Sequence, residues 1–356
     1  MTLFSILISV QSRQFSRLIV DTGAGSPPCP NCGRVPVLAQ VPVSPGQIDF
    51  SKLTHITLSR KSHQYASDID FVMRLSPQSN LQTGRNSLGF LLDTWRSMSY
   101  VFAWDGRRGF QATTPKTDAG CFDYHPIGRV CEYVSDNMHA GTALIPIPQL
   151  WLTYSRIPGV DGVIGANRLG LNFQRDFVVF PDTSSTMKLV FNPPDLSSFT
   201  CRGRYMSKLP LTADAYSKGT WQVLGRLGCG EIAAVGEVVL STGPSPILLE
   251  SQVFANFKSR MKWAGARMYY HSGLGAFKVN DCRRYKQRFP VIEVNMGDFT
   301  STILPEDYTY FSHDTGGGCL IDVDEAKNGI MQLGPAFLRN HVVWFRESTV
   351  GMCLRV

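Results

Sequence analysis

The sequence lacks any long hydrophobic run. Its apolar stretches are short, and none of them reaches the ~18 residues that a membrane-spanning helix needs. The apolar start, MTLFSILISV, has no positively charged segment before it and is too short for a secretory leader. We therefore expect no membrane span and no signal peptide in this chain, and interpret it as a mature fragment or an incomplete gene model.

The sequence also lacks the usual motifs of metal and nucleophile sites. There is no G-x-S-x-G, and the seven histidines are scattered. Cys29 and Cys32 form one C-x-x-C, but zinc would need two further ligands, and a redox role would need a βαβ context. A G-x-G-x-x-A pattern at residues 228–233 precedes a strand-like segment and does not open a long helix. We expect neither a metal nor a cofactor.

Positive charge exceeds negative charge but is not concentrated in a recognised motif. The formal net charge is +7, with small clusters at Arg107–Arg108 and among residues 283–288. Neither cluster lies in an RNA-binding signature, a zinc-finger spacing or a sustained basic helix face. We interpret the excess as a solvated surface and expect no nucleic-acid partner.

Short apolar segments between turn-forming residues predict a mainly β fold. The chain has 32 glycines and 21 prolines, and its apolar runs, such as FVVF and VVWF, are rich in β-branched and aromatic residues. The clearest helix is expected to start near Ser251 as its N-cap, with Val253, Phe254, Phe257 and Met261 on one face. The length suits two lobes, which we place at residues 1–190 and 191–356.

Two strand-like segments end in similar turns. LIVDTGAG at Leu18–Gly25 places Asp21 at the tip of an apolar strand, followed by Thr22 and Gly23. VVLSTGPSPILL at Val238–Leu249 repeats the pattern with Ser241 where an acid would stand. Two such loops that face each other would form a catalytic pair, which is incomplete here.

Five segments in order resemble the pepsin-like aspartic peptidases over nearly the whole chain. They are the N-terminal hairpin ending in LIVDTG, DGVIGANRLG at Asp161–Gly170, VVLSTG, the stretch Cys282–Leu320, and IMQLGPAFLRNHVVWF at Ile330–Phe345. The resemblance implies an all-β, bilobal fold of two barrel-like lobes around a central peptide-binding cleft. It also implies a disulfide between Cys282 and Cys319.

The resemblance assigns the chemistry to two positions. Two carboxylates in that family share a proton and hold a water; one acts as a base and the other as an acid. Asp21 matches the first, whereas the hydroxyl of Ser241 can replace neither. Thr22 and Thr242 match the threonines that bond across the two loops, with Gly23 and Gly243 beside them.

A flap hairpin is expected at Cys131–Ile147. Tyr133 is the candidate for the family's flap tyrosine, with the tip at Ser135–His139, although a strand residue packed in the core is the alternative. Residues Phe50–Pro115 match the family poorly, and we expect an insertion within this range.

Nine cysteines favour an oxidising compartment, so we expect a secreted, endomembrane or vacuolar location. Because the number is odd, at least one thiol is expected to be free or paired with another chain.

Three functions remain open: an aspartic endopeptidase with doubtful activity, a non-catalytic homologue that acts as an inhibitor-like or protein-binding module, and a hydrolase in which a second carboxylate comes from elsewhere. The expected ligand is a peptide or protein, and the expected state is a monomer.

Overall fold

The computed structural model describes residues 53–354 apart from short gaps. All described residues belong to the compact unit Val43–Val356. The gaps are residues 62–68, 83–86, 104–108, 125–127, 142, 155–158, 170–175, 184, 194–199, 202–203, 273–274, 281, 283–285 and 312–317.

Strands dominate the described chain up to residue 191. They are β1 (His55–Lys61), β2 (Ile69–Pro77), β3 (Leu88–Asp93), β4 (Ser99–Phe102), β5 (Thr117–Tyr124), β6 (Gly128–Ala140), β7 (Ala143–Thr153), β8 (Gly162–Gly165), β9 (Phe177–Pro181) and β10 (Thr186–Phe191). In the first half of β7, buried apolar side chains alternate with exposed ones, which is the pattern of a strand with one face on the core.

The later strands are more often short. They are β11 (Thr200–Cys201), β12 (Arg204–Tyr205), β13 (Ser207–Pro210), β14 (Gln222–Cys229), β15 (Ile232–Leu240), β16 (Ile247–Leu249), β17 (Met268–His271), β18 (Ala276–Val279), β19 (Ile292–Met296), β20 (Phe299–Ile303), β21 (Thr309–Phe311), β22 (Cys319–Ile321), β23 (Val323–Glu325), β24 (Met331–Leu333), β25 (His341–Phe345) and β26 (Thr349–Leu354).

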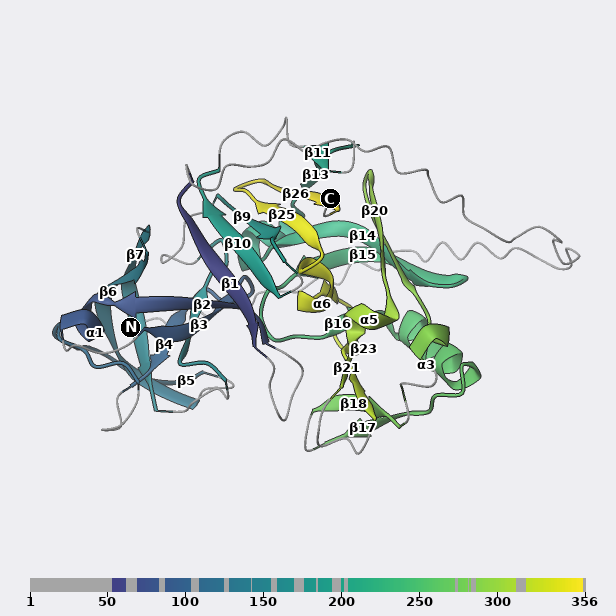
Figure 1. Cartoon of the computed structure of the whole chain (residues 1–356), viewed down its shortest axis with the longest axis horizontal. Helices are drawn as coiled ribbons and strands as arrows, with labels where there is room; N and C mark the ends of the chain where they lie inside the picture. The colour runs from purple at the N-terminus through teal and green to yellow at the C-terminus, as the bar shows by residue number, and fades with distance from the viewer. Residues whose placement is uncertain are drawn as a thin grey trace, which may run out of the picture. The chain divides into compact units, whose positions relative to one another are not determined.

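These strands form three main sheets and one two-stranded ribbon, β11-β12 (Figure 1). The largest sheet has thirteen strands in the order β13-β26-β25-β9-β10-β1-β2-β3-β8-β4-β7-β6-β5. A seven-stranded sheet has the order β20-β19-β14-β15-β24-β16-β23, and a four-stranded sheet has the order β17-β18-β22-β21.

The helices are few and mostly short. They are α1 (Gln78–Gln82), α2 (Ala213–Lys218), α3 (Ser251–Trp263), the 3-10 helix η3 (Lys286–Arg288), α5 (Pro305–Tyr308) and α6 (Pro335–Leu338). The longest, α3, buries Val253, Phe254, Phe257 and Met261 as predicted. Its N-cap is Glu250 and not Ser251, because the Glu250 carboxylate accepts a hydrogen bond from Gln252 N (2.8 Å).

The core is one large apolar cluster with two smaller ones beside it. The large cluster takes side chains from both main sheets, such as Phe90 and Phe177 from the thirteen-stranded sheet and Leu227 and Val294 from the seven-stranded sheet. It also contains Trp221, which precedes β14, and Phe257 of α3. Phe345 stacks on Phe177 with 4.8 Å between ring centroids and meets Trp221 edge-on at 5.1 Å. Aromatic side chains from distant parts of the sequence therefore pack against one another in the core.

Phe50–Pro115, where the sequence predicts an insertion, contributes strands to the thirteen-stranded sheet, and an insertion within the range stays a prediction. The described part of this range contains β1 to β4, and β1 pairs with β10 while β3 pairs with β8 inside the largest sheet. The predicted lobe boundary falls inside β10, and β13, β25 and β26 from the second half join the first half's sheet. The division into lobes at residues 190 and 191 stays a prediction.

Candidate functional site

Two loops with the same local scaffold follow β3 and β15. β3 is an apolar run that ends in Asp93, and β15 ends at Leu240, immediately before Ser241. Each strand has a parallel neighbour, β8 beside β3 and β24 beside β15. Parallel neighbours end at the same edge of a sheet, so each loop leaves its sheet next to the end of a second strand.

Reciprocal hydrogen bonds join the two loops. The Thr94 hydroxyl donates to Leu240 O (3.0 Å), and the Thr242 hydroxyl donates to Leu92 O (2.7 Å). Each hydroxyl also accepts from the other threonine's backbone N–H, at 3.0 Å in both directions. Both threonines are fully buried. The symmetry of these four bonds makes Asp93 and Ser241 equivalent positions of the two loops.

Asp93 is a buried carboxylate with several donors around it. Its oxygens accept from Trp95 N (2.9 Å) and from Arg96 Nε (3.1 Å), which also makes an ion pair. Burial raises the pKa of Asp93, against the opposing effects of the Arg96 guanidinium and of the Trp95 and Arg96 backbone N–H groups. A Cβ on Gly243 would lie 2.8 Å from this carboxylate, so the second loop closes directly over it.

Ser241 is also buried but keeps its hydroxyl within its own loop. Its Oγ accepts from Gly243 N (3.3 Å) and lies 3.2 Å from Ser245 Oγ. The Gly243 N–H thus bonds Ser241 as the Trp95 N–H bonds Asp93, two residues along in each case. A serine hydroxyl carries no charge and does not exchange its proton near neutral or acid pH, so the described junction holds one carboxylate where a dyad would hold two.

Glycines beneath the loops let the backbone come close. A Cβ on Gly165 would lie 2.6 Å from Met98 O and 2.7 Å from Arg96 O. A Cβ on Gly334 would overlap Ser245 O in the same way. Gly165 ends β8 and Gly334 follows β24, and these two strands run parallel to β3 and β15, the strands that precede the two loops.

An apolar cluster shares the sheet face of Asp93. Leu91 precedes Asp93 by two residues on β3, so their side chains point to the same face. Leu91 clusters with Val163 of β8, Tyr100 of β4 and Trp151 of β7. Tyr133 packs at the edge of this cluster, 5.2 Å from the Trp151 ring centroid. The carboxylate therefore lies on the same sheet face as a buried aromatic and aliphatic cluster.

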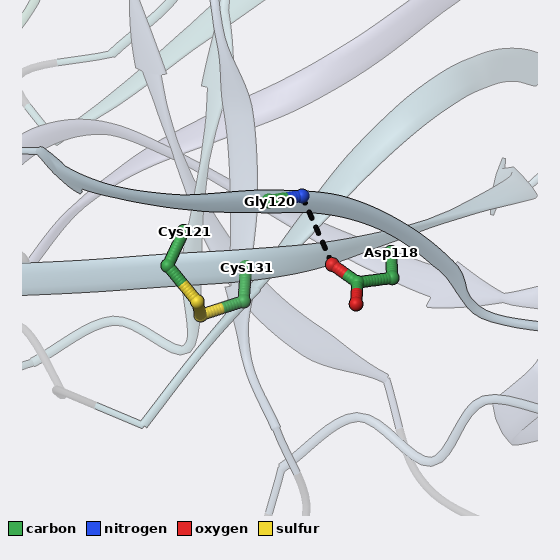
Figure 2. Close-up of a disulfide and its surroundings, with 4 residues drawn as sticks. All are labelled: Asp118, Gly120, Cys121 and Cys131. Atoms are coloured by element: carbon green, nitrogen blue, oxygen red, sulfur yellow. Dashed lines mark hydrogen bonds between the residues drawn. A yellow bond between two sulfur atoms is a disulfide. The ribbon is translucent and has the colours of Figure 1, made fainter.

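A disulfide crosses the hairpin of β5 and β6 (Figure 2). Cys121 and Cys131 face each other across the two strands with 4.1 Å between their Cα atoms. Just before it, Asp118 accepts from Gly120 N (2.9 Å), and the positive φ of Gly120 (76°) accompanies a shift in register. β5 is the last strand of its sheet, so β6 and this disulfide hold it in place.

β6 and β7 form a hairpin where the sequence predicts one, at Cys131–Ile147, but its tip lies elsewhere, and its role as a flap stays a prediction. Tyr133 lies within β6, in register with Trp151, so it is a strand residue. The tip predicted at Ser135–His139 is wrong, because those residues continue β6 and the chain turns at Gly141, whose φ of 59° suits glycine.

The predicted first loop, with Asp21, Thr22 and Gly23, lies outside the described residues, and its role stays a prediction. Among the described residues, the partner of Thr242 is Thr94, and Asp93 lies opposite Gly243. Sequence reasoning missed Asp93 because Trp95 stands where the D-T-G pattern has its glycine. The available signal was LGFLLDT, an apolar strand that ends in Asp-Thr.

The cysteines follow the sequence prediction where they are described. Cys282 and Cys319 form the disulfide expected from the resemblance, with 5.9 Å between their Cα atoms. Cys229 is a buried free thiol, and burial raises its pKa to about 11. In the described ranges, no three His, Cys, Asp or Glu side chains gather as a metal site would require. No helix there is both long and apolar enough to cross a bilayer.

Comparison with known proteins identifies the fold. No protein-family model matches the chain, and a comparison with curated proteins finds no match either. The crystal structure of an aspartic proteinase from Irpex lacteus is similar, with a TM-score of 0.61 and 14% sequence identity. The match covers 85% of this chain and 98% of that one. The chain thus has the pepsin-like aspartic proteinase fold that its sequence predicted.

Proposed function

We propose that this chain is an aspartic-peptidase homologue that binds an extended peptide where its two loops meet. The proposal assigns Asp93, and not Asp21, as the carboxylate at the centre of that site. Its main support is the reciprocal bonding of Thr94 and Thr242, which makes Asp93 and Ser241 equivalent. Met98 and Tyr133, which are only partly buried at the edge of the apolar cluster around Leu91 and Trp151, would contact a peptide side chain near the carboxylate.

We further propose that peptide-bond hydrolysis is very slow or absent. A carboxylate dyad needs one group as a base toward water and a second group as an acid toward the carbonyl oxygen. Ser241 supplies neither, and loss of a general acid or base lowers a rate by about 10²–10⁴-fold. Arg96 lowers turnover further, because its ion pair stabilises the charged form of Asp93 and occupies one of its oxygens.

The disulfides support a place of action outside the reducing cytosol. Cys121–Cys131 and Cys282–Cys319 are both formed, and such bonds persist in secreted, endomembrane or vacuolar compartments. The monomeric state expected from the sequence belongs to the same proposal.

The test compares cleavage of a peptide library by the native chain and by Ser241→Asp, alone and combined with Arg96→Ser. We expect the double variant to cleave about 10²–10⁴-fold faster than the native chain. Asp93→Asn should abolish that gain, whereas Asp21→Asn should leave it intact. A native chain that cleaves as fast as the double variant would overturn the proposal of lost activity.

Binding needs a separate measurement, because a chain without turnover can still bind peptides. A fluorescent peptide selected from the same library with the native chain serves as the probe in an anisotropy titration. Tyr133→Ala should weaken its binding, since Tyr133 packs on Trp151 at the edge of the apolar cluster. Tyr269→Ala in the four-stranded sheet is the control and should not. Equal effects of the two variants would argue against a site beside Asp93.

A further inference from the structure

One segment accounts for the net positive charge of this chain. Residues 251–290 contain nine of the 35 lysines and arginines but only one of the 28 acidic residues, Asp281. The rest of the chain is nearly balanced, with 26 cationic and 27 anionic side chains. The described elements of this segment are α3, β17, β18 and η3, and α3 contacts β17 (Figure 1 labels α3, β17 and β18).

Exposed aromatic side chains lie in the same segment. Trp263, at the end of α3, is 79% exposed, and Tyr270, on β17, is 55% exposed. Tyr269 precedes Tyr270 on β17, so the two rings project from opposite faces of the hairpin formed by β17 and β18. Large aromatic side chains usually lie in a core or at an interface. Three exposed ones, Trp263, Tyr269 and Tyr270, lie here on α3 and on the edge strand β17.

Lysines flank these rings and are held against aromatic faces. Lys258 Nζ lies 4.8 Å from the ring centroid of Phe254, which in turn packs on Phe277 at 5.4 Å. Lys278 Nζ lies 6.0 Å from the ring centroid of Tyr269, and Phe277 contacts Tyr270. Lys262 adds a further cation next to Trp263. Cations and aromatic rings therefore alternate from α3 to the edge strand β17.

We propose that α3 and the β17–β18 hairpin form a surface that binds an anionic lipid membrane peripherally. Lysines close to an anionic bilayer gain electrostatic attraction, and tryptophan and tyrosine rings settle at the interface between headgroups and hydrocarbon. β17 is the edge strand of its sheet, and rings on both of its faces suit insertion among lipid headgroups. A nucleic acid would instead be expected to follow a basic groove with its bases stacked on one face.

Sedimentation with lipid vesicles tests the proposal on the full chain. The probes are phosphatidylcholine vesicles with about 30% phosphatidylserine and vesicles of phosphatidylcholine alone. We expect binding only to the anionic vesicles, with weaker binding as salt rises from about 0.1 M to about 0.5 M, because the charges are exposed. No binding to the anionic vesicles at about 0.1 M salt would overturn the proposal.

Matched variants locate the surface. Replacing Lys258, Lys262 and Lys278 by glutamine should weaken vesicle binding about hundredfold, at roughly fivefold for each lysine. The control replaces the exposed Lys116, Lys208 and Lys218 by glutamine, which changes the net charge equally, and should weaken binding far less. Equal losses from both triple variants would mean that net charge alone drives binding, and would overturn the assignment.

A single substitution tests the contribution of the exposed tryptophan to vesicle binding. Trp263→Ser should weaken vesicle binding and Val235→Ser, at a 78% exposed position on β15, should not. Vesicle binding should also shift the fluorescence of Trp263 to shorter wavelength.

Other polyanions are the competing partners for this surface, so labelled RNA, duplex DNA and heparin are tested beside the vesicles. If one of them binds more tightly than the anionic vesicles and the same lysines are responsible, the surface serves that polymer and the membrane proposal fails.

Discussion

At the scale of single residues, the junction of the two loops depends on two hydroxyl groups. Thr94 Oγ1 donates to Leu240 O and accepts from Thr242 N, and both partners are buried. Thr94→Val keeps the side-chain volume but leaves these two backbone groups unpaired, and we expect the free energy of unfolding to fall by about 2–4 kcal/mol. Urea denaturation of the native chain and of the variant measures this change in the free energy of unfolding.

The matched control is Thr57→Val. Thr57 is exposed on β1, and its hydroxyl accepts from Lys188 Nζ, so its loss should change the free energy of unfolding by about 0.5 kcal/mol or less. A Thr94 variant as stable as the Thr57 variant would show that the reciprocal bonds do not hold the loops together.

Arg96 controls the protonation of Asp93. Its guanidinium lowers the pKa of Asp93 while burial raises it, so Arg96→Leu should raise this pKa further. Carbon-13 NMR titration of the aspartate carboxyl groups measures the shift, with Asp93→Asn to assign the signal. Arg226→Leu, which removes an exposed partner of Glu293, should leave the pKa of Asp93 unchanged. An unchanged or lower pKa of Asp93 in the Arg96 variant would mean that Arg96 does not stabilise the Asp93 carboxylate in solution.

At the scale of elements, the β5–β6 hairpin depends on its disulfide. Among the described strands β5 pairs with β6 alone, and its residues Thr117–Cys121 are exposed, so few of the contacts described hold it. The double substitution Cys121→Ser with Cys131→Ser should speed amide hydrogen exchange in β5 and lower stability by about 2–3 kcal/mol. Cys229→Ala, which removes a thiol in no cross-link, is the control for β5 exchange. Unchanged exchange in the serine variant would show that strand pairing alone fixes β5.

Elements with a strong apolar pattern were predictable, and residues defined by contacts across the fold were not. The buried face of α3 follows from its helical spacing, and the strands that precede Gly165 and Gly334 follow from their apolar residues. Asp93 was missed because its identity depends on Thr242, 148 residues later than Thr94, and no local glycine marks the loop. The observed turn at Gly141 was also missed, because strand alternation continues through Asn137 and Met138.

At the scale of the whole molecule, one imidazole connects two sheets. His341 begins β25 in the thirteen-stranded sheet, and its Nε2 lies 2.8 Å from the hydroxyl of Ser301 on β20 in the seven-stranded sheet. Its Nδ1 donates to Phe337 O (2.8 Å), so the Ser301 hydroxyl donates to Nε2 in the neutral ring. Burial lowers the pKa of His341 to about 4.

This pKa makes the folded chain sensitive to acid. The unfolded state binds a proton at His341 near pH 6.5 and the folded state only near pH 4. Its contribution is therefore fully present above about pH 6.5 and is lost as the pH falls to about 4, by about 3 kcal/mol in all. Asp93 and Asp307 act in the opposite direction, because burial raises both pKa values, so the total pH dependence is a sum of opposing effects.

Comparison with His341→Gln isolates the imidazole from the carboxyl groups. Asp93 and Asp307 are present in both proteins, so the difference in their free energies of unfolding reports on position 341 alone. We expect this difference, native minus variant, to fall by about 3 kcal/mol between pH 7 and pH 4 in urea denaturation. A difference that stays constant over this range would mean that His341 titrates normally in the folded chain.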